Sequence, residues 1–407
     1  MLAQFYAPTL GGEERMVETL AATLIARGHE VAVATLRQPG QDEQEERSGV
    51  TVYRLPGVAQ RLPWLFSESD RRHAPPAPDP ETVLALRRVV ARFAPDIVHA
   101  HNWLDNAYLP LARRGNAAYV VSLHDYSLVC ANKRLVRDIT PCAGPGPARC
   151  VACTAAQYGA LSGPPIALLT ATSSRWRRRQ ADMMLPVSEY VASRCGLRDG
   201  ATPFEVLPNF LAPKSAVVET GPSLALPDPG YIQFAGDLTA DKGIHVLLAA
   251  YQGLRAAPPL VLVGRTVDVN PADAPVGATL TGPVPHEHVE QAWRGCSVAV
   301  VPSLQPEAFG LVALEAMQAG KPVIAARSGG LAEVVVDNQS GILVEPGNSD
   351  QLRAAIQRVL DDDGLRTRLG TGAAERAAQF TAEAVIPRYE DAYRRALAHR
   401  RARGRSR

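Results

Sequence analysis

Short apolar runs alternate along the chain with longer stretches that are apolar on one side only. Leu2–Tyr6 is an apolar run of strand length, and Val31–Leu36 is the next one. The residues between them predict a helix from Glu13 to Arg27 that ends at Gly28. Its apolar positions recur at helical spacing, at Met16, Val17, Leu20 and Leu24. A strand, a helix and a second strand in this order indicate a parallel α/β sheet with a glycine-bearing turn where such sheets bind ligands.

The same alternation continues and then starts again in the second half of the chain. The further predicted strands are Ile97–Ala100, Ala118–Leu123, Tyr231–Ala235, Leu260–Val263, Val298–Val301 and Val323–Ala326. Helices are predicted after Lys242 and from Asp350 to Leu360. Residues 208–230 contain five prolines and two glycines, and their apolar residues follow neither the helical nor the strand spacing. We expect them to form the linker between the two halves. We expect two Rossmann-like, doubly wound domains that face each other across a cleft.

The expected domain bounds are 1–210 for the first domain and 228–385 for the second. Residues 386–407 would form a C-terminal helix and a basic tail. Tyr389, Tyr393 and Leu397 are spaced to pack from this helix, and seven arginines fall within 394–407. We expect the helix to cross back to the first domain and the tail beyond it to fray.

Composition narrows the class of protein. The chain has 407 residues, of which 46% are hydrophobic and 21% charged, as in ordinary globular proteins of about two domains. Its formal net charge of +2 gives no reason to expect a nucleic-acid partner. No apolar run is long enough to span a membrane, and the N-terminus lacks the features of a signal peptide. Six cysteines are too few for a disulfide scaffold, so a cytoplasmic location is expected.

Two carboxylates lie around the start of one predicted helix in the second half. Glu307 precedes a Phe-Gly pair, and Glu315 lies about one turn into the apolar run that begins at Leu311. A helix N-terminus attracts anions such as phosphate, whereas carboxylates accept hydrogen bonds from hydroxyl groups. Phosphate between two sets of hydroxyls describes a nucleotide sugar. The alternative is an amphipathic helix with two solvated glutamates.

The motifs along the chain resemble those of the retaining glycosyltransferases of the GT-B fold, in the large family four. They are Gly11-Gly12-Glu13-Glu14-Arg15, Gly28-His29-Glu30-Val31, His124-Asp125, Val187-Ser188, Leu207-Pro208-Asn209, Lys242-Gly243, Gly282, Pro302-Ser303, the Glu307/Glu315 pair, Gly329-Gly330, and Gly341 with Leu343-Val344. The resemblance covers nearly the whole chain. It implies transfer of a sugar from a UDP- or GDP-type nucleotide sugar to a hydroxyl acceptor, without a catalytic metal. Such transfer would serve the synthesis of a glycan, a glycolipid or a natural-product glycoside.

The resemblance also implies a role for each residue that matches a motif. Glu307 would bind hydroxyls of the donor sugar, and Glu315 would bind the ribose hydroxyls. Lys242 would neutralise the leaving diphosphate, and His124 would lie beside the reacting carbon. These assignments give the catalytic set His124, Glu307 and Lys242. The donor-binding set is Gly11, Gly12, Gly236, Lys242, Phe309, Gly310, Leu311, Val312 and Glu315. The family's front-face mechanism would let the departing phosphate deprotonate the acceptor.

One residue departs from the family pattern. The family usually has arginine where this chain has Asp237, and an aspartate repels a diphosphate. A second cation, such as Arg265 after Gly264, would compensate, and we favour this account because the rest of the donor site is intact. Otherwise the donor is bound differently, or the protein is a weak or non-catalytic GT-B subunit that binds sugar nucleotides.

Four of the six cysteines fall within 24 residues. They are Cys130, Cys142, Cys150 and Cys153, and the last two form a C-x-x-C pair. Four thiolates at such spacing suit a structural Zn site, and an Fe–S cluster fits as well. A bound metal would brace the acceptor side of the site. The alternative is four free thiols or a redox disulfide.

A basic and aromatic stretch, Arg175-Trp176-Arg177-Arg178-Arg179, follows the apolar residues 166–171. Relatives with lipid-linked acceptors often touch a membrane surface with this half. Tryptophan beside arginines suits an anionic interface, which would place the protein at the inner face of the membrane. A solvated basic helix face is the alternative.

Overall fold

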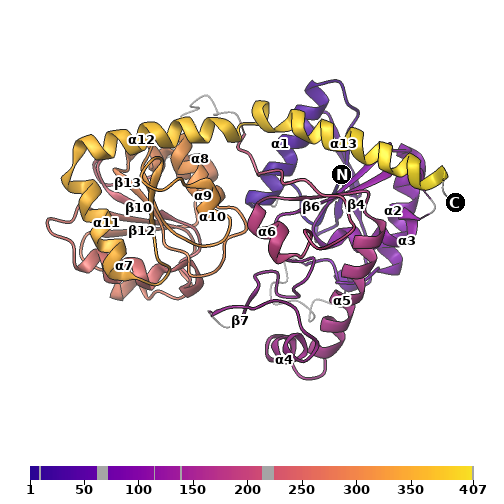
Figure 1. Cartoon of the computed structure of the whole chain (residues 1–407), viewed down its shortest axis with the longest axis horizontal. Coiled ribbons are helices and arrows are strands. Elements are labelled where there is room, and N and C mark those ends of the chain that lie inside the picture. Colours follow the sequence, from indigo (N-terminus) through magenta and orange to yellow (C-terminus); the bar gives the residue numbers. More distant parts are fainter. Residues whose placement is uncertain (9–10, 62–71, 114, 138–139, 213–223, 406–407) are drawn as a thin grey trace. The chain divides into compact units, whose positions relative to one another are not determined.

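The computed structural model describes residues 1–8, 11–61, 72–113, 115–137, 140–212 and 224–405 (Figure 1). The chain divides into two compact units. Unit 1 comprises Met1–Leu135, Ala143–Pro208 and Ala382–Arg407. Unit 2 comprises Val136–Cys142 and Asn209–Thr381. Residues 213–223 of the predicted linker lie outside the described part of the chain.

Unit 1 is built on a seven-stranded sheet with the order β3-β4-β2-β1-β5-β6-β9. Its strands are β1 (Leu2–Ala3), β2 (Ala32–Leu36), β3 (Gln44–Arg47), β4 (Val50–Leu55), β5 (Ile97–His101), β6 (Ala118–Leu123) and β9 (Met183–Pro186). The strands pair in parallel except β3, which is antiparallel to β4. The helices are α1 (Gly12–Ala26), α2 (Pro80–Phe93), α3 (Leu109–Ala112), α4 (Pro147–Tyr158), α5 (Gly163–Gln180), α6 (Glu189–Arg194) and α13 (Ala382–Arg405).

The C-terminal helix α13 belongs to unit 1, although it follows unit 2 in sequence. It packs against α1 and β6, with Tyr389 fully buried. Glu390 on α13 pairs with Arg27 at the end of α1, with 2.7 Å between Oε2 and Nη2. The helix continues to Arg405, so most of the tail that was expected to fray is helical.

Unit 2 repeats the plan with six parallel strands in the order β12-β11-β10-β13-β14-β15. The strands are β10 (Ile232–Ala235), β11 (Leu260–Val263), β12 (Ala278–Gly282), β13 (Val298–Val301), β14 (Val323–Ala326) and β15 (Gly341–Val344). The helices are α7 (Ile244–Gln252), α8 (His286–Gly295), α9 (Leu311–Gln318), α10 (Leu331–Val334), α11 (Ser349–Asp361) and α12 (Asp363–Ala377). A two-stranded ribbon, β7 (Val136–Arg137) with β8 (Thr140–Pro141), stands apart from both sheets.

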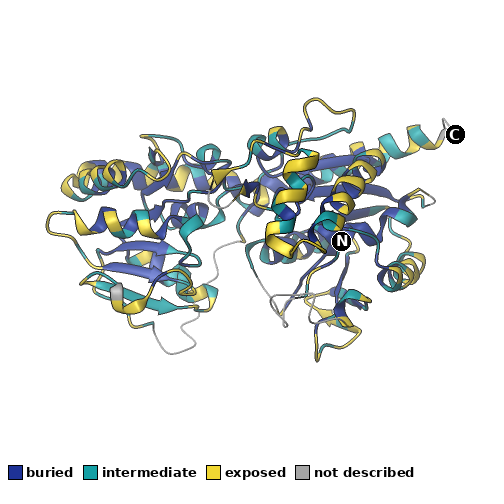
Figure 2. Cartoon of the chain, turned by 90° about the horizontal axis from the view of Figure 1, so that it is seen from below, coloured by how far each residue is buried: buried dark blue, intermediate teal, exposed yellow. Residues whose placement is uncertain are grey.

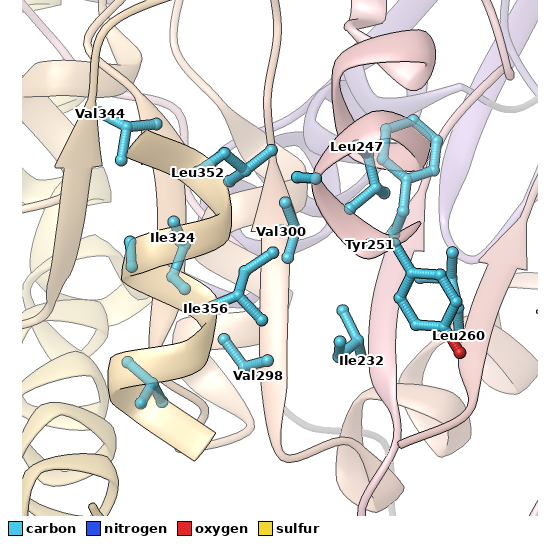
Figure 3. Close-up of a cluster of buried hydrophobic side chains, with 14 of the residues drawn as sticks. Ile232, Leu247, Tyr251, Leu260, Val298, Val300, Ile324, Val344, Leu352 and Ile356 are labelled. Atoms are coloured by element: carbon cyan, nitrogen blue, oxygen red, sulfur yellow. The ribbon is translucent and has the colours of Figure 1, made fainter. Parts of the chain in front are cut away.

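The core of unit 2 forms where α7 and α11 cover the sheet (Figure 3). The labelled members of this cluster are Ile232, Leu247, Tyr251, Leu260, Val298, Val300, Ile324, Val344, Leu352 and Ile356. Burial of such side chains contributes about 1.5–3 kcal/mol each. Most strand residues in both units are buried, whereas the edge strand β3 is mostly exposed and many other exposed residues lie on helices and loops (Figure 2).

The predicted parallel α/β class is confirmed, and each predicted strand overlaps an observed one, although the first is Leu2–Ala3 where Leu2–Tyr6 was expected. Ala118–Leu123, Leu260–Val263, Val298–Val301 and Val323–Ala326 match to the residue. Gly28 follows α1 with a φ of +91°, in the left-handed region that suits a helix stop. Among the described residues, no helix combines the length and the apolar character needed to cross a membrane.

Candidate active site

Four loops meet at one edge of the unit 2 sheet. They follow β10, β11, β13 and β14, and the carboxyl ends of parallel strands share an edge. The loop after β10 leads to Lys242, and the loop after β13 carries Ser303 and Glu307. Ligands of open α/β sheets bind at this edge, so the second-half residues predicted from the sequence lie where a ligand is expected.

Lys242 and Glu307 are in direct contact. Nζ of Lys242 donates a hydrogen bond to Oε1 of Glu307 at 2.7 Å. The hydroxyl of Ser303 donates to the same oxygen at 2.7 Å. The side chain of Glu307 is 17% exposed and that of Lys242 is 33% exposed, so solvent reaches the pair. A cation and a carboxylate therefore stand side by side at the sheet edge.

Backbone contacts hold the loop of Lys242 against the loop of Glu307. Gly243 has a φ of +76°, and a Cβ there would lie 2.0 Å from the carbonyl oxygen of Pro302. Only glycine allows this approach, which brings the Lys242 turn against the loop after β13. The amides of Leu304 and Gln305 donate to the carbonyl of Asp241, at 2.9 and 3.2 Å.

The loop after β14 supports Glu307 from the other side. The amide of Gly330 donates to the carbonyl oxygen of Glu307 at 2.7 Å. A Cβ on Gly329 would lie 2.2 Å from that oxygen, and its φ is +58°. The Gly329-Gly330 pair singled out in the sequence therefore positions the backbone of Glu307.

The charge of Lys242 is well supported. Burial of its ammonium group opposes the charged form, but the carboxylate of Glu307 outweighs this effect, so the pKa of Lys242 is raised. The charges of Asp241 and Asp237 act in the same direction. Lys242 is therefore a cation at neutral pH.

Helix α9 begins at Leu311, a few residues after Glu307, and Gly310 is its N-terminal cap residue. Leu311 and Val312 form its first turn, and Phe309 is buried just before it. Glu315 follows in the second turn, on the partly exposed side. Nε2 of His286, at the start of α8, lies 3.9 Å from a Glu315 oxygen. His286 was not singled out in the sequence, because it belongs to none of the motifs recognised there.

The aspartate that departs from the family pattern has a cationic partner. Arg265, in the loop after β11, binds Asp237 through two hydrogen bonds of 3.1 and 2.7 Å. Gly236 precedes Asp237 at the end of β10. The compensating cation predicted from the sequence therefore lies beside Asp237 and neutralises its charge.

In unit 1 the predicted glycines begin helix α1. Gly11 is the cap residue and Gly12 is the first helical residue. The amide of Gly11 donates to Oε2 of Glu14 at 2.8 Å. Gly11, which the resemblance assigns to the donor-binding set, thus has its amide bound to the glutamate of its own helix.

Glu13 adds a carboxyl group that the sequence analysis did not assign a role. Its Oε1 accepts a 2.6 Å hydrogen bond from the side-chain amide of Asn102, which directly follows β5. Burial, together with the charges of Glu14 and Asp125, raises the pKa of Glu13 to about 8. The carboxyl group is therefore largely protonated at neutral pH.

Glu13→Gln should change the pH dependence of stability. Between pH 4.5 and 8 folded Glu13 keeps a proton that the unfolded chain releases. The stability that this group contributes is thus fully present below pH 4.5 and lost as pH rises through 8. Glutamine does not titrate, so the Tm of the variant relative to the wild type should increase across this range.

Glu43→Gln, at a side chain that is 81% exposed, is the control. An equal pH dependence for wild type and Glu13→Gln would contradict the shifted pKa.

His124 directly follows β6 and contacts another histidine. Its Nε2 lies 2.9 Å from Nδ1 of His101, the last residue of β5. The two rings are nearly parallel, with 18° between their planes. His101 was missed in the sequence because a histidine at the end of an apolar strand gives no periodic signal.

The cysteines do not assemble the predicted metal site. Among the described residues, no three or more His, Cys, Asp or Glu side chains are grouped to hold a metal ion. All six cysteines are free thiols. Sγ of Cys130 donates to Asn132 at 2.8 Å, and Sγ of Cys150 accepts from the amide of Gly146 at 3.4 Å. Cys130 and Cys150 thus each have a local hydrogen-bond partner. Cys142 belongs to unit 2, whereas Cys130, Cys150 and Cys153 belong to unit 1.

Comparison with known families gives the same picture as the site. A family model described as "Glycosyl transferase 4-like domain" matches residues 11–209. A second, described as "Glycosyl transferases group 1", matches residues 221–376. A D-inositol 3-phosphate glycosyltransferase 1 of Catenulispora acidiphila is 30% identical over 371 residues, which are 84% of this chain and 85% of the relative. The chain belongs to the glycosyl transferase group 1 family, also called GT4.

Coverage of other relatives is partial. Two further D-inositol 3-phosphate glycosyltransferases, 38% and 34% identical, match over only 34% and 41% of their own length. These matches support the family without fixing the substrates of this chain.

Solved structures share the fold over the full length. A sucrose-phosphate synthase from Thermosynechococcus elongatus superposes with a TM-score of 0.71 at 23% identity, over 96% of this chain and 94% of the other. Anabaena HepE, solved in complex with UDP-glucose, superposes with a TM-score of 0.67 at 17% identity, over 96% and 97%. The chain has the GT-B fold of these glycosyltransferases.

Proposed function

We propose that this protein transfers a sugar from a nucleoside diphosphate sugar to a hydroxyl acceptor, with retention of anomeric configuration. The contact between Lys242 and Glu307 at the start of α9 carries the proposal. A cation and the N-terminus of a helix can bind the negatively charged diphosphate, and a carboxylate can accept hydrogen bonds from sugar hydroxyls. Glu315, in the second turn of α9, would accept hydrogen bonds from the ribose hydroxyls.

The reaction we propose is the front-face transfer that the family resemblance implies. The bond between the anomeric carbon and the phosphate oxygen breaks, and the acceptor oxygen bonds to the same face of that carbon. The departing phosphate oxygen takes the acceptor's proton. Lys242 and the amides at the start of α9 would stabilise the negative charge that grows on the diphosphate. Glu307 would hold the sugar hydroxyls while the bond breaks.

A panel of UDP-, GDP- and ADP-sugars tests the donor assignment by thermal shift. A donor at 100 times its Kd should stabilise the protein by about 2.7 kcal/mol. Release of nucleoside diphosphate is then measured with sugar, lipid-linked and inositol phosphate acceptors, the last because the relative from C. acidiphila is named for one. No Tm shift with any donor would overturn the proposal. Binding without transfer or hydrolysis would favour a non-catalytic sugar-nucleotide-binding subunit.

We also propose a peripheral contact with an anionic lipid surface through helices α4 and α5, which pack together. Ten large hydrophobic side chains are exposed in the described part of the chain, and six lie on or between these helices. They are Val151, Tyr158, Leu161, Leu168, Leu169 and Trp176. Residues 139–181 contain five arginines and no acidic residue. Arg177 is buried, and the other four, at 149, 175, 178 and 179, are at least partly exposed. Apolar side chains beside arginines favour an anionic membrane surface.

Sedimentation with lipid vesicles tests the contact. The protein should bind vesicles that contain phosphatidylserine, bind neutral vesicles weakly, and dissociate at high salt. Leu168→Glu should lower binding because it places a charge on the apolar face. Leu84→Glu on α2, at a side chain that is 58% exposed, is the matched control. Equal binding by both variants would contradict this surface.

A further inference from the structure

A buried row of histidines lies behind His124. His101 is fully buried and forms the 2.9 Å contact with His124 already described. His99, two residues earlier on the same strand, lies with its ring centroid 4.1 Å from that of His101. The sugar-transfer reaction as proposed assigns nothing to His99 or His101.

His101 is held in a fixed place. Its neighbour His99 bonds the hydroxyl of Ser122 through Nε2 and that of Tyr393, from α13, through Nδ1, each at 2.8 Å. β5 and β6 pair in parallel, with His101 opposite Ser122. Strand register and ring stacking thus direct one nitrogen of His101 at His124.

The two nitrogens of His101 differ in their surroundings. Nδ1 faces Nε2 of His124, whereas Nε2 of His101 is buried and has no hydrogen-bond partner among the described residues. Burial, with the nearby charges of His99 and His124, lowers the pKa of His101 well below 6.5, so the ring is neutral and carries one N–H. A buried N–H without an acceptor is rare and costly. The hydrogen therefore belongs on Nδ1, where His124 accepts it.

We infer that His101 is a positioning residue that donates its Nδ1–H to Nε2 of His124 and so fixes neutral His124 as the Nδ1–H tautomer. Free imidazole prefers the Nε2–H form, so the contact reverses that preference. His124 then carries its hydrogen at Nδ1. With Nε2 engaged by His101, that nitrogen of His124 is not available as the base for the acceptor. The effect on transfer rests on the proposed function, whereas the tautomer does not.

Two substitutions at His101 separate positioning from packing. His101→Asn keeps a donor, because the side-chain amide nitrogen takes the place of Nδ1. His101→Leu removes the donor and fills a similar volume. Loss of one neutral hydrogen bond, about 1 kcal/mol, should lower kcat about 5-fold in His101→Leu, with little change in KM for the donor. His101→Asn should restore most of kcat. Tm measurements show whether both variants fold.

The tautomer itself is read by NMR on protein labelled with ¹⁵N in its histidine rings. The His124 signals are identified by their loss in His124→Asn. In the wild type and in His101→Asn, His124 should show a bare Nε2 and a protonated Nδ1. In His101→Leu it should revert to the Nε2–H form.

The outcomes are distinct. Nε2–H on wild-type His124, or an unchanged tautomer in His101→Leu, would overturn the inference whatever the activity. Equal loss of kcat in both variants would overturn the positioning role. The expected tautomers in a protein that binds no nucleotide sugar would leave the inference standing and defeat the proposed function.

Discussion

Glu307→Gln is expected to reduce sugar transfer by about 10²-fold or more while the protein stays folded. The carboxylate accepts from both Lys242 and Ser303, and an amide replaces one of its acceptor oxygens by a donor. That donor would face sugar hydroxyls and leave Lys242 without its charged partner. The backbone of Glu307 is held by Gly330, so the loop should keep its shape.

Initial rates with a donor found in the thermal-shift panel measure this effect, and Tm reports folding. Glu345→Gln, at a unit 2 side chain that is 63% exposed, provides the matched control and should retain wild-type rates. Turnover of Glu307→Gln close to that of the wild type would exclude Glu307 from the donor site.

Lys242→Ala is expected to lower turnover by about 10²-fold or more. Negative charge on the leaving diphosphate grows towards the transition state, and Lys242 is the cation beside Glu307. Because the raised pKa keeps Lys242 charged, the loss should persist across neutral and mildly alkaline pH. Donor affinity should fall less than kcat, since the charge on the diphosphate is largest after the bond begins to break.

Lys321→Ala, in the turn before β14, is the control for loss of a lysine from the same unit. It should leave kcat unchanged. A Lys242→Ala variant that loses donor affinity but keeps kcat would mean that Lys242 binds ground state and transition state equally.

The sequence predicted several of the fully buried strands. Strands covered on both faces, such as Ala118–Leu123 and Val298–Val301, read as unbroken apolar runs, and these were located to the residue. The strands β3, β4, β9, β12 and β15 of the two sheets were not predicted. Of these, β3, Gln44–Arg47, is a polar and mostly exposed edge strand. Its residues form a strand only through antiparallel pairing with β4.

The sequence indicated which residues belong to the candidate site, but it did not indicate how they contact one another. Glu307 and Lys242 were named from their motifs and from the helix that follows Glu307. Their 2.7 Å contact joins positions 65 residues apart, and strand order creates it by bringing the loops after β10 and β13 to one edge. The pairing of Asp237 with Arg265 was proposed as compensation, and the neighbouring strands β10 and β11 bring it about.

The sequence by itself determined the α/β class, the position of eight strands and the position of Glu307 and Glu315 around the start of a helix. These features can be read locally, from apolar runs and from the signals that mark the start of a helix. Only the tertiary structure decided the partners of isolated polar residues. It joined His101 to His124 through the register of β5 and β6, and it turned cysteines with metal-like spacing into free thiols with local hydrogen bonds. The reason is physical: a single histidine or cysteine has the same local signal whatever faces it, and its partner depends on strand order and register.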